Sequence, residues 1–392
     1  MKPLTVMLIA GEPSGDMLAA ELVTAMRAEF ERRGFTPRFV GAGGSHMRAA
    51  GVEFGFGLTK HSVIGVSDAL KGYFKFRRFI NQLVCLALAH RPDVIVCVDF
   101  SGFNRRFVRA LRSLLGCRLL KTNSWKPKIA QYVSPQVWAS RPGRAKSMAR
   151  DYDLLLSIFP FEKAWYAQRV PKFRVEFVGH PIVDRHGKAE SGKQKAEMTE
   201  TPLLLLLPGS RISELNRHLP VMVAAVNRIR AVRNDARFGM VLPNEELKRL
   251  ASTLVPLPPG IEVNVGDLAE ALAESTAAIA STGTVTLECA YFGVPTVALY
   301  KTSWSTYQIG KRIVGVKYLA MPNLLANEEI FPEFIQDDAT PEKIADAALD
   351  LLGNDTRRRE IQTKLARVIE SLGGPGAAAR AARAVLSLLA PD

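Results

Sequence analysis

Cysteine is scarce in this chain of 392 residues, and that scarcity excludes a scaffold built on disulfides. The four cysteines are Cys85, Cys97, Cys117 and Cys289, and no two of them form a C-x-x-C pair. This usage is typical of a protein kept in a reducing compartment, so we expect reduced thiols in the core. The six histidines lack the spacing of metal ligands, and no metal site is predicted.

Long apolar runs are also missing. No stretch reaches the roughly 18 apolar residues that a transmembrane helix needs. The first ten residues imitate a signal peptide, with Lys2 before an apolar run, but Glu12 and Asp16 follow at once and no small-x-small cleavage site precedes them. We therefore expect a cytoplasmic protein, whose association with the inner face of the cytoplasmic membrane would be peripheral.

Acidic residues are outnumbered by basic ones, 38 Asp and Glu against 52 Lys and Arg, for a net charge of +14. Such a balance favours anionic partners, whether nucleic acid, acidic lipid or phosphorylated substrates. No RNP-like, KH-like or zinc-knuckle pattern is present, so a basic nucleic-acid-binding protein is only a remote alternative, and no nucleic-acid partner is expected.

Length and strand rhythm predict two α/β domains. A chain of 392 residues exceeds the size at which a single core usually keeps growing. Short apolar strands alternate with helical stretches, which argues for parallel sheets. In the first half the expected strands are residues 4–10, 38–41, 94–98, 128–132, 154–157 and 175–178. In the second half they are residues 203–207, 238–242, 261–265, 276–280, 296–299 and 318–320.

The polar stretch 184–201 reads as a linker. We therefore expect an N-terminal domain over residues 1–183 and a C-terminal domain over residues 202–365. Residues 366–392 would form a final helical region.

The stretch from Ser281 to Glu288 is the most informative in the chain. Ser281, Gly283 and Thr284 follow a short strand and open a helix, whose start carries partial positive charge and unpaired N–H donors that suit a phosphate. Glu288 lies about one turn further on, where a carboxylate suits the hydroxyls of a ribose. The alternative is a capped helix, with Thr284 as N-cap and Glu288 on a solvated face.

A second strand-to-helix turn has similar chemistry. The apolar run 203–207 ends in Pro208-Gly209-Ser210-Arg211, followed by Glu214. Gly209 permits a tight turn, Ser210 can cap the next helix, and Arg211 supplies a charged fork for phosphate oxygens. Ligands of open α/β sheets bind at the carboxyl ends of strands, where both turns lie. Together they predict a site for a nucleotide diphosphate.

The amino-terminal half repeats the layout with acidic residues. Its first strand runs into Gly11-Glu12-Pro13-Ser14-Gly15-Asp16, which lacks the G-x-G-x-x-G fingerprint of a nicotinamide dehydrogenase and would repel a pyrophosphate. The strand 94–98 ends in Asp99, a reasonable general base at the carboxyl edge of a sheet. The alternative for Asp99 is a helix cap.

One segment interleaves basic and aromatic residues. Residues 68–81 contain Lys71, Phe74, Phe76, Arg77 and Arg78. A helix of this kind can lie in a membrane interface, drawn by apolar insertion and anionic lipid. The alternative is a helix that covers the sheet and exposes a basic face. A second basic run, residues 141–150, either holds the phosphate of an acceptor sugar or is the exposed face of a helix, and the second interpretation is slightly favoured.

These motifs carry a family resemblance. The ordered set is Ala10-Gly-Glu-Pro-Ser-Gly-Asp16, Asp99-x-x-x-Phe-Asn104, Tyr132-Val-Ser-Pro-Gln-Val-Trp138, Phe159-Pro-Phe-Glu162, Phe177-Val-Gly-His-Pro181, Leu207-Pro-Gly-Ser-Arg211, Ser281-Thr-Gly-Thr-x-x-Leu-Glu288 and Pro322-Asn-Leu-Leu325. It closely resembles the lipid-A-disaccharide synthases, glycosyltransferases of the GT-B superfamily, over nearly the whole chain. The sequence departs from the family pattern at Ser140, where Trp is usual, and at Gly102, where many members have Asp.

The resemblance implies a GT-B architecture, two Rossmann-like domains with mainly parallel sheets facing across a cleft. It implies an inverting, metal-independent transfer of 2,3-diacylglucosamine from UDP to 2,3-diacylglucosamine 1-phosphate, in lipid A biosynthesis. No cofactor is expected, and the last helix is expected to cross back to the first domain. The oligomeric state, including a homodimer, is left open. The alternative is another GT-B enzyme of UDP-sugars, a glycosyltransferase or an epimerase.

The expected roles follow from the residues and the resemblance together. The catalytic base is Asp99, with Glu12 and Asp16 as rivals. The acceptor and membrane side has Ser14, Lys71, Phe74, Phe76, Arg77 and Arg78. The UDP-sugar side has Gly209, Ser210, Arg211, Ser281, Gly283, Thr284, Glu288 and, carried over from the family, Asn323, whose alternative is an ordinary loop residue.

Overall fold

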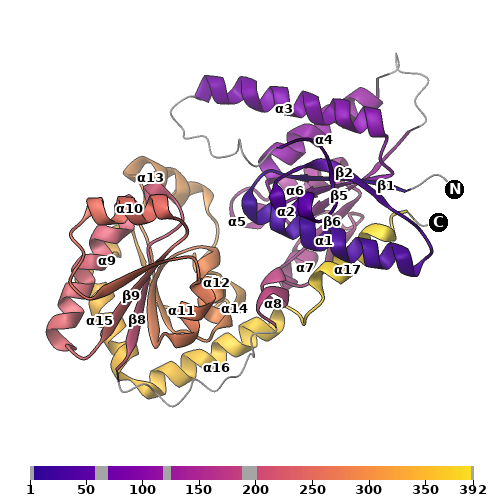
Figure 1. The fold of residues 1–392 in the computed structure, drawn as a ribbon. Coiled ribbons are helices and arrows are strands. Elements are labelled where there is room, and N and C mark those ends of the chain that lie inside the picture. The colour runs from indigo at the N-terminus through magenta and orange to yellow at the C-terminus, as the bar shows by residue number, and fades with distance from the viewer. Residues whose placement is uncertain (1–3, 58–68, 118–124, 188–200, 390–392) are drawn as a thin grey trace. The chain divides into compact units, whose positions relative to one another are not determined.

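The structure is a computed structural model that describes residues 4–57, 69–117, 125–187 and 201–389. The chain forms two compact units (Figure 1). The first contains Met1–Asp184 and Leu372–Asp392, and the second contains Arg185–Ser371. The second unit therefore continues to Ser371, six residues beyond the expected boundary at 365. Residues 188–200 of the predicted linker lie outside the described residues.

The first unit is built on a seven-stranded, fully parallel sheet of order β3-β2-β1-β4-β5-β6-β7. Its strands are β1 Thr5–Ala10, β2 Arg38–Gly43, β3 Glu53–Gly57, β4 Val94–Val98, β5 Lys128–Tyr132, β6 Leu154–Ser157 and β7 Val175–Phe177. Its helices are α1 Pro13–Arg32, α2 Ser45–Ala49, α3 Ala69–His90, α4 Ser101–Leu115, α5 Val137–Ser140, α6 Arg144–Asp151, α7 Pro160–Ala167, α8 Pro181–His186 and α17 Ala377–Leu386, with the unit boundary inside α8. β1, β4 and β6 are buried throughout, which explains their continuous apolar sequences.

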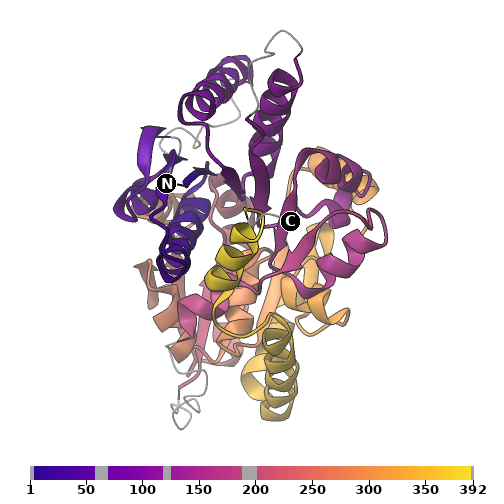
Figure 2. The same cartoon turned by 90° about the vertical axis from the view of Figure 1, so that its right-hand side faces the viewer.

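The C-terminal helix α17 belongs to the first unit and packs along α1 (Figure 1 and Figure 2). Hydrogen bonds hold this returning segment in place. The backbone N–H of Gly376 donates to the Asp184 carboxylate at 2.5 Å, and the Arg380 guanidinium donates to the Val178 carbonyl at 2.7 Å. The Arg383 guanidinium pairs with Glu29 of α1 at 3.1 Å. The last helix therefore completes the amino-terminal unit, as the family resemblance implied.

The second unit has a six-stranded parallel sheet of order β10-β9-β8-β11-β12-β13. Its strands are β8 Leu203–Leu207, β9 Arg237–Leu242, β10 Ile261–Val265, β11 Ala277–Ser281, β12 Thr296–Tyr300 and β13 Glu333–Ile335. Its helices are α9 Ile212–Val232, α10 Glu245–Leu254, α11 Leu268–Glu274, α12 Thr284–Tyr291, α13 Trp304–Ile313, α14 Met321–Ala326, the 3-10 helix η4 Gln336–Asp338, α15 Pro341–Gly353 and α16 Asp355–Ser371. An extended apolar core joins this sheet to its covering helices.

Three expectations from the sequence need correction. Residues 318–320 form no strand, and the edge of the second sheet is β13 instead. The edge strand β3 was not predicted, because its sequence, EFGFG, carries two glycines and little β-branched character. Cys97 and Cys289 are buried as expected, but Cys85 and Cys117 are exposed rather than in the core. Among the described residues, no helix is long and apolar enough to cross a membrane.

Candidate functional site

Each sheet reverses its strand order at one place, and the predicted site residues lie at these two places. In the first unit the reversal is between β1 and β4, where Ala10 pairs with Val98. In the second it is between β8 and β11, where Leu207 pairs with Ala280. Helix connections leave such a switch point in opposite directions, so a ligand can enter between the two turns. The fold thus brings the turn after residue 10 beside Asp99, and the turn at Gly209 beside that at Gly283.

Asp99 lies in a strained turn at the end of β4. Asp99 and Phe100 both adopt the left-handed conformation, with φ of 49° and 40°. That conformation is uncommon outside glycine, so two in succession mark a turn that the surrounding structure must hold. The Phe100 ring supplies part of this support, because it stacks on Phe103 at 5.3 Å between centroids.

Two buried amides fix the backbone of Asp99. The Asn104 side chain donates to the Asp99 carbonyl at 2.8 Å, and the Gln131 side chain donates to the same oxygen at 3.0 Å. The Asp99 N–H donates to the Tyr132 carbonyl at 2.9 Å. Asn104 and Gln131 are fully buried, and the carbonyl oxygen of each side-chain amide has no partner. The motif Asp99-x-x-x-Phe-Asn104 therefore supplies one of the two side-chain amides that fix the backbone of Asp99.

Glycines in the neighbouring turn make room for the turn at Asp99 and Phe100. A Cβ atom built on Gly11 would lie 2.2 Å from the Phe100 ring, so a larger residue there would clash. A Cβ atom on Gly15 would lie 3.6 Å from the Cβ of Asp99. The close approach brings the first turn of α1, with the exposed side chains of Glu12 and Ser14, to the edge where Asp99 lies.

Burial raises the pKa of Asp99, and the hydrogen bond from the Phe100 N–H only partly opposes it. A carboxylate with a raised pKa is a better proton acceptor than an ordinary aspartate. The alternative role, a side-chain helix cap, is not observed. Phe100 is the N-cap of α4, and no side-chain cap is present.

Asp16, a predicted rival base, has a structural role instead. It is buried, and its carboxylate accepts hydrogen bonds from the backbone N–H groups of Gly44, His46 and Met47 at 2.7, 2.9 and 3.2 Å. These are donors at the start of α2, which has no other side-chain cap. Three such bonds occupy the carboxylate, and we therefore exclude Asp16 from the catalytic residues.

Glu162 is a site residue for which the sequence suggested no role. It is fully buried, and its carboxylate accepts a hydrogen bond from the Trp138 indole at 2.9 Å and another from the Phe159 N–H at 3.4 Å. Burial raises its pKa to about 7, although hydrogen bonds from Trp138 and Ser134 act in the opposite direction. Glu162 thus joins two of the family motifs at the carboxyl ends of β5 and β6. The signal in the sequence was a lone acid within the aromatic motif Phe159-Pro-Phe-Glu162.

The turn after β8 has the donors that an anion needs. Gly209 has φ of +119°, which favours glycine. The N-cap of α9 is Arg211 rather than the predicted Ser210, and it gives no side-chain cap. The Glu214 carboxylate accepts from the Ser210 N–H at 3.0 Å and pairs with the Arg211 guanidinium at 3.0 Å. Arg211 is 76% exposed. The Arg211 guanidinium and the Ser210 N–H therefore both bind the Glu214 carboxylate.

A buried histidine connects this turn to the next part of the sheet. The His218 Nδ1 lies 2.9 Å from the Pro208 carbonyl, and its Nε2 lies 3.0 Å from the Lys301 N–H. Burial lowers the pKa of His218, which favours the neutral ring. In that form Nδ1 donates and Nε2 accepts, because the first partner is a carbonyl and the second an N–H group. His218 thus links the turn after β8, where a phosphate is predicted to bind, to the end of β12.

The turn after β11 differs from the capped helix that was its alternative. The N-cap of α12 is Gly283, with φ of +142° and no side-chain cap, so Thr284 does not fill that position. Gly283 and Thr284 are exposed, whereas Ser281 is buried at the end of β11. Glu288 is half-buried rather than solvated, and burial raises its pKa while Arg185 lowers it. The start of α12 therefore presents backbone donors to its surroundings.

Asn323 has a structural role in the second unit. It is fully buried in α14, where its amide nitrogen donates to the Phe331 carbonyl and to Glu333, and its oxygen accepts from the N–H groups of Ile330 and Phe331. These four bonds of 2.7–2.9 Å use the hydrogen-bonding capacity of the side chain. The ordinary loop position is thus wrong, because Asn323 fixes the turn that precedes β13, and the nucleotide contact stays a prediction.

The structure describes some of the side chains of α3 that were expected to contact a membrane. The side chains of Lys71 and Phe74 lie outside the described residues. Phe76 is half-buried and packs against Phe103 and Phe100, at 5.8 and 6.3 Å between ring centroids. Phe76 is therefore a core residue, as the alternative held, and not a membrane anchor. Arg77 and Arg78 are exposed.

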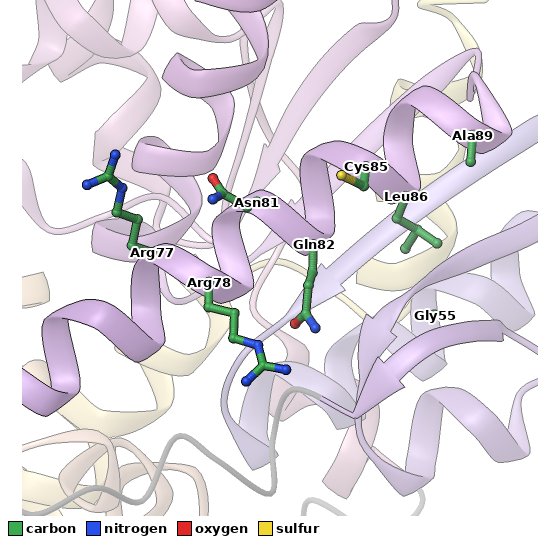
Figure 3. A pocket seen from close by; sticks show the side chains of 8 residues that line it. All are labelled: Gly55, Arg77, Arg78, Asn81, Gln82, Cys85, Leu86 and Ala89. Carbon is green, nitrogen blue, oxygen red and sulfur yellow. The ribbon is translucent and has the colours of Figure 1, made fainter.

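A groove of about 820 Å³ runs between α3 and the edge strand β3 (Figure 3). Gln82 and Leu86 point from α3 toward Gly55, while Arg77 and Arg78 extend in different directions at one end of the row. A Cβ atom on Gly55 would lie 2.7 Å from Leu86, so the glycine permits close packing.

Within the described part of the chain, no group of three or more His, Cys, Asp or Glu side chains is placed to hold a metal ion.

Several solved structures share this fold. A putative UDP-N-acetylglucosamine 2-epimerase from Listeria monocytogenes is similar with a TM-score of 0.65 and 16% identity, over 99% of this chain and 97% of that one. The calicheamicin glycosyltransferase aligns over the whole of both chains with a TM-score of 0.58 and 18% identity. MurG of Acinetobacter baumannii gives 0.55 and 14%, over 98% and 100%. At these identities the likeness establishes the GT-B fold alone.

Sequence relatives are more specific. Lipid-A-disaccharide synthase of Myxococcus xanthus is 34% identical over 99% of this chain and 98% of the relative. The enzyme of the same name from Rhodopseudomonas palustris is 35% identical over 98% and 96%. The family described as lipid-A-disaccharide synthetase matches residues 6–388. From its first strand to its last helix, then, the chain belongs to the lipid-A-disaccharide synthetase family.

Proposed function

We propose that this protein transfers 2,3-diacylglucosamine from UDP to the 6-hydroxyl of 2,3-diacylglucosamine 1-phosphate. The bond between the anomeric carbon and the UDP oxygen breaks, a β-1,6 bond forms, and the hydroxyl proton passes to a base. The products are UDP and a tetra-acyl disaccharide phosphate. The family match over residues 6–388 carries this proposal.

Asp99 is the base in this mechanism. It lies in a strained turn at the switch point of the first sheet, its backbone is fixed by three hydrogen bonds, and burial raises its pKa. Inversion requires the hydroxyl to attack from the face opposite UDP, so the base and the nucleotide site belong to different turns. Glu12 is the remaining rival, since it is exposed at the neighbouring turn.

The second unit binds UDP. The Arg211 guanidinium, the Ser210 N–H and the backbone donors at Gly283 and Thr284 meet the charge that develops on the departing β-phosphate. A pyrophosphate bound there competes with Glu214 for two of these donors. Glu288, one turn into α12, accepts hydrogen bonds from the ribose hydroxyls. These protein donors supply the stabilisation that a Mg²⁺ ion gives in many nucleotide enzymes, and we propose that turnover needs no metal.

The direct test is incubation with both lipid substrates followed by mass analysis of the product. Wild-type protein should give one disaccharide phosphate per UDP, with unchanged turnover in EDTA. A product with an epimerised sugar, or hydrolysis alone, would overturn the proposal. Asp99→Asn and Glu12→Gln form a matched pair at the base. Loss of turnover in Glu12→Gln with normal turnover in Asp99→Asn would move the base to Glu12.

We also propose that the protein associates peripherally with an anionic membrane surface, since its substrates carry acyl chains. The support is limited to exposed Arg77 and Arg78 on α3. Sedimentation with phosphatidylglycerol vesicles at low salt should fall in an Arg77→Gln/Arg78→Gln variant. The control is Lys172→Gln, an exposed cation of the same unit. Equal sedimentation of both variants and wild type would refute this role.

A further inference from the structure

Four arginines gather between α4 and α6, and we call them the arginine cluster: Arg105 and Arg109 in the second and third turns of α4, Arg144 as the first residue of α6, and Arg141 just before it. The two helices pack side by side. Burial and the charge of Arg109 lower the pKa of Arg105. Burial, followed by the charges of Arg141, Arg105 and Arg109, lowers that of Arg144. These side chains therefore repel one another at short range.

The repulsion is relieved at only one end of the cluster. Asp151, the last residue of α6, pairs with Arg109 at 2.9 Å and with Arg150 at 2.7 Å. Among the described residues, no carboxylate lies within 4.0 Å of the charged groups of Arg105, Arg141 or Arg144. The uncompensated charge is thus concentrated toward the first turns of the two helices.

That location is unfavourable for a cation. A helix start carries partial positive charge, which disfavours the guanidinium of Arg144 at the first position of α6. Arg105 and Arg144 are also half-buried, which adds a desolvation cost. Below them, the Tyr152 hydroxyl is buried, lies within electrostatic reach of Arg105 and Arg109, and has no hydrogen-bond partner. A bound anion with several acceptor oxygens would offset these costs together.

The cluster lies beside the proposed base. α4 begins two residues after Asp99, and α5 and then α6 follow β5, so α4 and the segment from α5 to α6 both leave the carboxyl edge of the sheet. Arg105 is about one turn, or roughly 6 Å of rise, along α4. The acceptor presents its 6-hydroxyl and its 1-phosphate at opposite ends of one hexose ring. A phosphate site one sugar length from Asp99 is therefore what the reaction requires.

We propose that the arginine cluster binds the phosphomonoester of the acceptor sugar, with Arg105 and Arg144 as its principal ligands. This inference rests on the proposed function. Guanidinium groups suit a phosphomonoester because they donate two parallel hydrogen bonds to its oxygens. The phosphates of anionic lipids have related chemistry, but half-buried side chains at the edge of a sheet suit a single ligand better than a broad surface.

The test compares Arg105→Gln, Arg144→Gln and the double variant with wild type, in neutral detergent micelles. The control is Lys146→Gln, which removes one exposed positive charge from the same helix as Arg144. Loss of a charged hydrogen bond should raise the acceptor KM roughly tenfold to a hundredfold per arginine. The donor KM and thermal stabilisation by UDP should stay at wild-type values. Arg105→Lys should recover part of the loss.

A second arm uses the acceptor without its phosphate, 2,3-diacylglucosamine. Wild type should prefer the phosphorylated acceptor, and the double variant should lose most of that preference, which a folding defect would not produce. An unchanged preference, or the same KM as in Lys146→Gln, overturns the inference. So does loss of binding to phosphatidylglycerol vesicles with a normal acceptor KM, which would assign the cluster to lipid. If wild type makes no disaccharide at all, the proposed function itself fails. Should the glutamine variants not fold, Arg141→Gln, at an exposed position, decides the same comparison.

Discussion

Replacing Glu162 with glutamine removes a buried acid whose protonation is coupled to folding. Burial raises its pKa from the ordinary 4.5 to about 7 in the folded protein, against hydrogen bonds that favour the ionised form. Desolvation therefore outweighs the donors from Trp138 and the Phe159 backbone. The carboxyl group is fully buried, so little solvent screening reduces the effect.

The sign follows from proton counting. Between pH 4.5 and 7 the folded chain holds a proton on Glu162 that the unfolded chain has lost. The stability contributed by this group is thus complete below about pH 4.5 and is lost as pH rises through 7. At about 1.4 kcal/mol per pH unit, the loss is roughly 3 kcal/mol. A glutamine side chain at this position cannot titrate, yet its amide oxygen can still accept the Trp138 indole bond. The Glu162→Gln variant should therefore gain roughly 3 kcal/mol relative to wild type between pH 5 and pH 8.

Urea unfolding at these two pH values, followed by tryptophan fluorescence, measures this difference. Trp125, Trp138 and Trp165 lie in the unit that contains Glu162, and only Trp304 lies in the other. Glu31→Gln, on the exposed side of α1, is the control for loss of one negative charge. If the midpoints of wild type and Glu162→Gln differ by the same amount at pH 5 and pH 8, the buried acid is not coupled to folding as we argue.

Four further outcomes are expected. Asp99→Asn should lower kcat by roughly two to four orders of magnitude while UDP still stabilises the protein. The wild-type kcat should fall as pH drops through a pKa above the usual aspartate value, because the base must be ionised. A kcat that stays constant toward acid pH would argue against Asp99 as the base. Gly209→Ala should weaken UDP binding in calorimetry, since a Cβ atom would lie 2.5 Å from the Glu214 carboxylate at a φ that favours glycine; unchanged affinity would place UDP elsewhere. Asn323→Ala should lower the melting temperature, because it leaves buried polar groups without hydrogen-bond partners. The donor KM should stay unchanged, and a raised donor KM in the folded variant would support the nucleotide contact. A thiol reagent should label Cys85 and Cys117 in the native protein, and Cys97 and Cys289 only after unfolding. Cys97 and Cys289 are buried, and burial raises the pKa of Cys289 to about 12. Labelling of all four cysteines at once would contradict the fold.

The local sequence specified much of the fold. Strands β4, β6 and β8 begin and end where the apolar runs do, because a strand buried on both faces needs apolar residues throughout or nearly so. The edge strands β3 and β13 were missed, since the sequence of the first, EFGFG, carries two glycines and that of the second, EFI, is only three residues long. Gly209 and Gly283 were recognisable because only glycine readily adopts their backbone angles.

The assignment of individual site residues needed tertiary structure. Asp16 and Asp99 are both acids after strands of one sheet, and no sequence pattern shows that three N–H groups of a distant helix occupy the first. The structural role of Asn323 was missed for the same reason, because its partners lie seven to ten residues further along the chain. The burial of Glu162 and the grouping of the four arginines depend on which helices pack together, which the local sequence does not show.

The sequence by itself determined the alternation of strands and helices, the glycine turns and the family, because each depends on neighbours along the chain. Tertiary structure alone decided which acid is held ready for proton transfer, which is buried as a cap, and where positive charge is left without a partner. Burial and charge pairing act through space between segments that can be far apart in the sequence, so they set a side chain's pKa and availability only once the chain has folded.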